Sequence, residues 1–209
     1  QQLRRNNRTS ARSSDGPARQ VALGTRSLLV EYRLVTLLLM RLKNIDAWSA
    51  ELPQGVVDDR LASVRTIFEE EVAKRHGLIQ ADPLGRYPES YLASFPGPSD
   101  AIATAAELMK LFQGGRPSLP AGSVEAGCAI NTGEIAERNG QLIGRPLEIV
   151  SRLEYRAEAS QVLFTESVLL SVGELALPYD ALLRKIGAET GPSMRAFSLN
   201  WAGGKDGES

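Results

Sequence analysis

SVEAGCAINTGEIAERNGQLIGRPLEIVSRLEYRAEASQVLFTES, residues 123–167, contains the pattern that decides the fold. It predicts, in chain order, an apolar strand over 124–132, a turn at the Gly-Glu pair 133–134, a short return run to Ile143, a helix over 146–157 and an apolar strand over 161–165. The remaining segments can be placed around this unit.

The helix begins at Pro146, because proline suits the first helical position, where its missing N–H leaves no bond unmade. Its apolar residues recur at helical spacing and predict the buried face: Leu147, Val150, Leu153 and Ala157. Glu148 and Arg152 are four residues apart and share another face. We expect the candidate functional residues of this helix on that second face.

The rest of the chain supplies further strands and helices. In order, the pattern predicts a strand buried on both faces over 33–41, a short helix over 48–52, an amphipathic helix over 56–76, hairpin arms over 78–81 and 89–95, a helix over 99–113 capped by Ser99 or Asp100, and strands over 181–186 and 194–199. This order predicts an α+β sandwich, with helices packed on a mainly antiparallel sheet.

Composition narrows the classes of function. The chain has 209 residues, 43% hydrophobic and 23% charged, which is ordinary for one globular domain. A formal net charge of -1 gives no basic field for nucleic acid. The single cysteine, Cys128, lies in an apolar strand, so it predicts a buried small side chain and a reducing, cytoplasmic compartment. No apolar run approaches the ~18 residues of a membrane helix.

The basic N-terminal segment, residues 1–32, has two interpretations. Its first twenty residues hold five arginines among Ser, Asn and Gly, which favours a solvated linker. The alternative is a juxtamembrane segment in the cytosolic part of a larger protein, because basic residues gather on the cytoplasmic side of a membrane span. We expect the domain over 33–201 and a polar tail over 202–209.

The opening stretch resembles the class III nucleotide cyclases, the adenylate and guanylate cyclase family. The residues that match the family pattern are Asn131, Thr132, Gly133, Glu134, Gly144, Arg152, Leu153, Glu154, Ala157 and Glu166. The resemblance implies a ferredoxin-like sandwich with an added hairpin, and a homodimer in which each site lies between two subunits.

The same resemblance implies two aspartates that hold Mg²⁺ or Mn²⁺, and they are not retained. Arg41 stands at the first position, and a guanidinium has no lone pair for a metal. Glu89 stands at the second and Gly85 at the position of the base-selecting lysine, although a register without an insertion puts the second aspartate itself at Gly85. Arg41 and Glu89 would then form a charge-assisted pair in place of the metal.

On the helix, the family's asparagine position is Glu148 and its transition-state arginine is Arg152; Lys185 corresponds loosely to a phosphate-contacting lysine. A surface Arg152 paired with Glu148 is the simpler interpretation.

The sequence therefore predicts an inactive cyclase-homology domain, without a cofactor, that acts as a regulatory and dimerising module, as a homodimer or with a regulatory protein partner. Two alternatives stay open. One is a residual adenylate or guanylate cyclase that uses Mg²⁺ or Mn²⁺, and the other is a sensor that binds a nucleotide without converting it.

Overall fold

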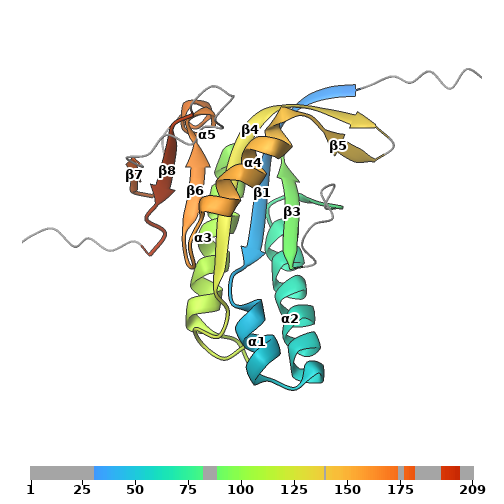
Figure 1. Ribbon diagram of the computed structural model, residues 1–209. Helices are drawn as coiled ribbons and strands as arrows, with labels where there is room; N and C mark the ends of the chain where they lie inside the picture. The colour runs from blue at the N-terminus through green and yellow to red at the C-terminus, as the bar shows by residue number, and fades with distance from the viewer. Residues whose placement is uncertain (1–30, 82–88, 139, 174–176, 182–193, 203–209) are drawn as a thin grey trace, which may run out of the picture.

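The computed structural model describes residues 31–81, 89–138, 140–173, 177–181 and 194–202, and these form one mixed sheet with helices on both faces (Figure 1). Seven of the eight described strands follow the order β2-β3-β1-β4-β6-β8-β7, and β5 pairs with β4 outside this path. β4 and β6 are parallel, and the other strand pairs are antiparallel. The predicted α+β sandwich is confirmed.

The bounds of the elements follow the sequence pattern closely. They are β1 (Glu31–Leu42), α1 (Ile45–Glu51), α2 (Gln54–Ala73), β2 (Leu78–Gln80), β3 (Ser90–Phe95), α3 (Pro98–Gly114), β4 (Ala126–Arg138), β5 (Gln141–Ile143), α4 (Arg145–Arg156), β6 (Val162–Thr165), α5 (Glu166–Ser171), β7 (Tyr179–Ala181) and β8 (Ala196–Leu199). Of the strand predicted over 181–186, residues 182–186 lie outside the described part of the chain.

β1 is an interior strand of the sheet and is buried on both faces, as its apolar run predicts. It pairs with β3 on one side and with β4 on the other. Successive side chains of a strand point to opposite faces, so Leu38 and Met40 enter one core cluster while Leu37 and Leu39 enter the other. β1 therefore contributes side chains to both cores.

The two cores lie on opposite faces of the sheet. α2 and α3 cover one face and contribute Phe68 and Leu108 to the larger core. α4 crosses the other face and buries Leu147, Val150 and Leu153 against the sheet. Figure 1 shows α4 in front of the strands and α2 and α3 behind them. α4 therefore packs one side on the sheet and exposes the opposite side to solvent.

The predicted turn at the Gly-Glu pair is wrong. β4 continues through Gly133, which pairs with Val35 of β1, and ends at Arg138. The chain reverses later, where Gly140 adopts a φ of 75° before β5. Gly133 serves packing instead, because a Cβ there would lie 2.8 Å from Cγ of Pro146.

The predicted cap of the 99–113 helix is also wrong. α3 begins one residue earlier, with Gly97 as its N-cap residue and Pro98 in its first turn, and no side chain caps it. Proline fixes φ near the helical value and has no N–H to leave unpaired, so the helix can begin there without Ser99 or Asp100 as a cap. Within the described residues, no helix has the length and apolar character needed to cross a bilayer.

Candidate functional site

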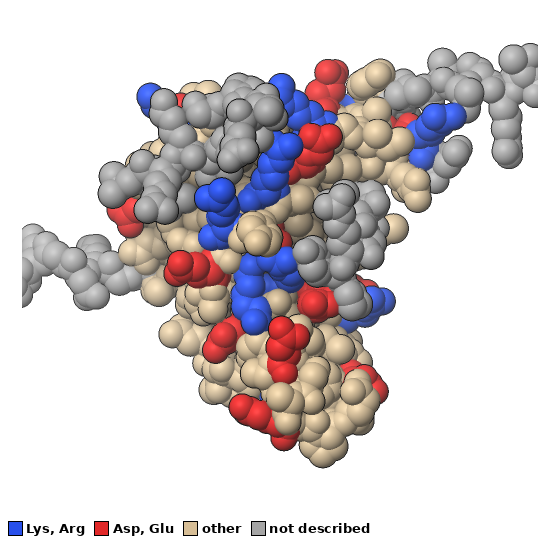
Figure 2. All heavy atoms as spheres, in the orientation of Figure 1, with Lys and Arg blue, Asp and Glu red and all other residues tan. Residues whose placement is uncertain are grey.

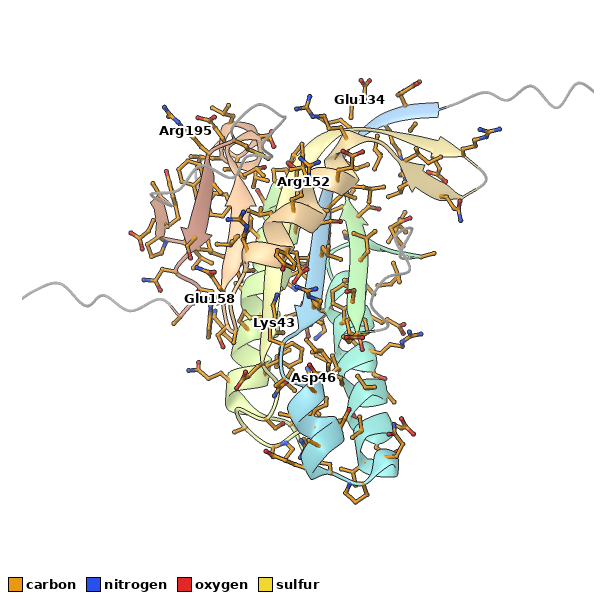
Figure 3. All side chains as sticks on the ribbon, viewed as in Figure 1. Lys43, Asp46, Glu134, Arg152, Glu158 and Arg195 are labelled. Carbon is orange, nitrogen blue, oxygen red and sulfur yellow. The ribbon has the colours of Figure 1, made fainter. Side chains whose placement is uncertain are left out.

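Charged side chains from the end of β1 and the last turn of α4 meet over the sheet. Arg41 lies at the end of β1 and Lys43 follows it, while Glu154 lies on the side of α4 that faces the strands. Figure 3 shows Lys43 between the end of β1 and the lower end of α4. We call Arg41, Lys43 and Glu154 the β1–α4 cluster.

One carboxylate in this cluster serves two cations. Oε1 of Glu154 lies 3.0 Å from Nε of Arg41 and 2.6 Å from Nζ of Lys43. Lys43 also donates to the main-chain carbonyl of Glu154, at 3.2 Å. The side chains of Arg41, Lys43 and Glu154 are only 14%, 16% and 5% exposed. Taken by themselves, the three side chains sum to one formal positive charge, because two cations share one anion.

A glycine under the β1–α4 cluster leaves room for the side chain of Lys43. Gly127 of β4 lies beneath the cluster, and a Cβ there would come within 2.7 Å of Cε of Lys43.

The neighbouring Cys128 is fully buried. Burial raises the pKa of its thiol, and the negative charge of Glu154 raises it further, against a smaller opposite effect of Lys43. Cys128 is therefore a neutral packing residue, as its apolar strand predicts.

An exposed aromatic ring adjoins the cluster. Tyr155 of α4 is 69% exposed, and the guanidinium of Arg41 lies 5.8 Å from its ring centroid. A cation over an aromatic face is a weakly attractive contact at an exposed site. Arg41 thus connects the buried carboxylate to a ring that faces solvent.

The other end of α4 is held by buried polar groups. Asn131 of β4 donates from Nδ2 to the carbonyl of Pro146, at 3.2 Å, and its Oδ1 accepts from Thr165 at 2.9 Å. Ser167 donates to the carbonyl of Thr132, at 2.9 Å. Because buried polar groups are costly when unpaired, this network fixes the first turn of α4 against β4 and β6. α4 is therefore fixed at both of its ends.

The backbones of Arg41 and Glu89 lie side by side, with Arg41 in β1 and Glu89 just before β3. Arg41 pairs with Ser90 in the β1–β3 register, and the N–H of Leu42 donates to the carbonyl of Glu89 at 3.3 Å. The carboxylate that the structure places against Arg41 is that of Glu154. The ion pair between Arg41 and Glu89 stays a prediction.

Arg152 and Glu148 lie on the solvent side of α4, and both are exposed. Among the ion pairs between described residues, none joins these two side chains, so the surface pair inferred from their spacing is not formed. Gly85 and Lys185 lie outside the described residues.

Sequence reasoning missed the roles of Lys43 and Glu154. A signal was present, because position 154 follows Val150 by four and so falls on the buried side of the helix. An ionised carboxylate on a buried face requires a cation, and Arg41 and Lys43 supply two.

The metal that the cyclase resemblance implies does not fit the described residues. Arg41, which stands where the resemblance implies one ligand, cannot coordinate a cation. Glu154, the buried carboxylate nearby, already accepts from two cations. Within the described residues, no group of three or more His, Cys, Asp or Glu side chains is placed to hold a metal ion. The described side chains of the cluster form an internal ion-pair network.

Comparison by sequence gives no match. No family model matches the chain, and no curated protein matches it.

Comparison by structure, in contrast, gives many matches. The chain is similar to the adenylyl cyclase CyaB from P. aeruginosa, with a TM-score of 0.68 and 15% identity over 81% of this chain and 95% of that one. It is similar to a dimeric guanylyl cyclase domain of the RhoGC fusion protein from the aquatic fungus Blastocladiella emersonii, with a TM-score of 0.68 and 13% identity over 81% and 98% of the two chains.

A third similar structure is the adenylate/guanylate cyclase/hydrolase from Silicibacter pomeroyi, with a TM-score of 0.65 and 20% identity over 81% of this chain and 97% of that one. The fold is therefore that of class III adenylate and guanylate cyclase catalytic domains, as the motif resemblance in the sequence implies. At these identities the likeness concerns the fold, and activity must be argued from the residues.

Proposed function

We propose that this chain is a cyclase-homology domain without cyclase activity, which acts as a dimerising, regulatory module. The observation that carries the proposal is the β1–α4 cluster, in which Arg41 and Lys43 share the carboxylate of Glu154. Cyclase chemistry requires divalent cations that offset the charge on the phosphates. A site whose described side chains include two cations on one carboxylate would repel such an ion.

Self-association is the part of the proposal that the comparisons favour. One of the similar structures is a non-canonical dimeric guanylyl cyclase domain. A symmetric pair requires a patch that complements itself, and a fold can keep that patch after the metal ligands are lost. The module would then transmit a signal by joining two chains.

An activity assay tests the absence of turnover. The full chain is incubated with ATP or GTP and with Mn²⁺ or Mg²⁺, and cyclic nucleotide is measured by chromatography. We expect no product above a no-protein blank. Cyclic nucleotide that grows with enzyme concentration, and that is lost in Arg152→Ala, would show the domain to be a cyclase and would overturn the proposal.

A further inference from the structure

At one end of the sheet, three strands continue past the end of β3. β1 pairs with β4 from Glu31 onward, whereas its pairing with β3 begins only at Thr36. β5 pairs with the last residues of β4. We call residues 31–35, 133–138 and 141–143 the three-strand end. Figure 1 shows it at the upper right, where β1 begins.

The two faces of the three-strand end differ. Residues paired directly across antiparallel strands point to the same side, and successive residues of a strand alternate between sides. The registers therefore put Tyr32, Leu34 and Ile143 on one face. They are 65%, 66% and 48% exposed. On the other face Ile135 and Leu142 are buried in the core under α4.

Tyr32, Leu34 and Ile143 form what we call the apolar patch. None of the three belongs to a core cluster of the described residues. Single apolar residues on a surface are ordinary, but neighbouring exposed ones mark a contact surface. Glu134 and Arg138 are exposed on the same face and offset one another in charge. Figure 2 shows side chains of both signs around this end of the molecule, so the charge that selects a partner must come from elsewhere.

The segment that precedes β1 supplies that charge. Residues 1–30 are joined to the three-strand end through Glu31, and they hold six arginines and one aspartate, a formal sum of +5. The whole chain has a net charge of -1, so the residues that follow sum to -6. An anionic surface would attract the end that carries the apolar patch and repel the rest of the domain. The charge distribution therefore favours one orientation.

We infer that the three-strand end binds an anionic lipid surface, with the arginines of residues 1–30 at the headgroups and the apolar patch against the acyl boundary. Peripheral binding of this kind depends on buried apolar area together with attraction to anionic lipid. Tyrosine is also enriched where membrane meets water. Nucleic acid or an acidic peptide would engage the arginines but offers less apolar surface to the patch. The inference goes beyond the proposed function and requires neither dimerisation nor the absence of turnover.

The charge requirement is tested by sedimentation of the full chain with vesicles. Vesicles of phosphatidylserine and phosphatidylcholine in equal parts should bind it, those of phosphatidylcholine alone should not, and added salt should weaken binding. Each arginine near an anionic surface contributes about fivefold to binding. The triple variant Arg4→Gln/Arg5→Gln/Arg8→Gln should therefore lower the partition coefficient by about 100-fold. The matched control is Arg65→Gln/Lys110→Gln, at exposed positions on α2 and α3, which should bind as the unaltered chain does.

The apolar requirement is tested in the same assay with Leu34→Thr and Ile143→Thr. Threonine keeps the preference of a strand for β-branched residues and removes part of the apolar surface. Each variant should lower the partition coefficient by about fivefold. Leu170→Thr is the control, since Leu170 is 80% exposed on α5, away from the three-strand end. Circular dichroism checks that each variant is folded.

Four results would overturn the inference. They are no sedimentation with either kind of vesicle, equal binding to both kinds, tighter binding to single-stranded RNA than to the anionic vesicles, and binding that the arginine variant abolishes while both threonine variants leave it unchanged. The last result would show that the arginines act without the apolar patch. The proposed function is tested separately, because none of these measurements depends on turnover or on association between copies of the chain.

Discussion

Removing the negative charge of Glu154 should lower the stability of this domain. Glu154→Gln keeps the shape of the side chain and an oxygen that can accept a hydrogen bond, but it removes the negative charge. Arg41 and Lys43 would then lie close together, mostly buried, without the anion that both now contact. The carbonyl of Glu154 would remain an acceptor for Lys43, and it cannot neutralise two cations.

The magnitude follows from the burial of the three side chains, which are 14%, 16% and 5% exposed. Removing one partner of a buried ion pair costs about 3 to 5 kcal/mol, because the remaining charge is left desolvated. We expect the lower end, about 3 kcal/mol, because the glutamine oxygen still accepts a bond. In a domain of this size 1 kcal/mol shifts the melting temperature by about 2 to 4 °C, so Tm should fall by about 6 to 12 °C.

The assay is urea unfolding followed by circular dichroism, with Glu158→Gln as the matched control. Glu158 lies four residues further along, is exposed, and makes no ion pair with a described residue (Figure 3). Its change should stay within about 0.5 kcal/mol. Lys43→Met should cost less in the Glu154→Gln background than alone, because the two residues interact. Equal unfolding free energies for Glu154→Gln and Glu158→Gln would refute the reasoning.

Two further predictions concern the metal position and the thiol. Arg41→Asp puts a carboxylate beside Glu89 and Glu154, where the cyclase resemblance implies a metal ligand. Isothermal titration should then detect Mn²⁺ binding that the unaltered chain lacks. No gain in Mn²⁺ binding would argue against the alignment. Burial raises the pKa of Cys128, so the native thiol keeps its proton while the unfolded thiol loses it above about pH 8.5. Unfolding free energy should therefore fall as pH rises above that value, by up to about 1.4 kcal/mol per unit; in urea titrations Cys128→Ala should lack this component, and an identical pH dependence in both proteins would contradict it.

Much of the fold follows from local pattern. The apolar run over 33–41 predicts a strand buried on both faces, and β1 contributes alternately to the two cores. The spacing of Leu147, Val150 and Leu153 predicts the buried side of α4. These features are readable because each depends on neighbours two to four residues away, within the period of a strand or a helix.

Predictions from local pattern were wrong at a glycine and at a proline, residue types that occur in more than one structural role. Gly133 followed by a glutamate is typical of a turn, and its actual role is to let Pro146 approach a continuous strand. Pro98 likewise begins α3 without the side-chain cap that Ser99 and Asp100 suggest. A glycine favours turns and close approaches alike, and only the position of the neighbouring element distinguishes the two.

The sequence by itself determined the strand and helix pattern and the likeness to cyclase domains, and that likeness implies a carboxylate where Arg41 stands. Only the tertiary structure decided which groups surround Arg41, since Lys43 and Glu154 are 111 residues apart in the chain. Their contact depends on the pairing of β1 with β4 and on the path of α4 across both strands. An ion pair between distant residues leaves no periodic signal, because it is set by the packing of whole elements and not by the spacing of residues within one.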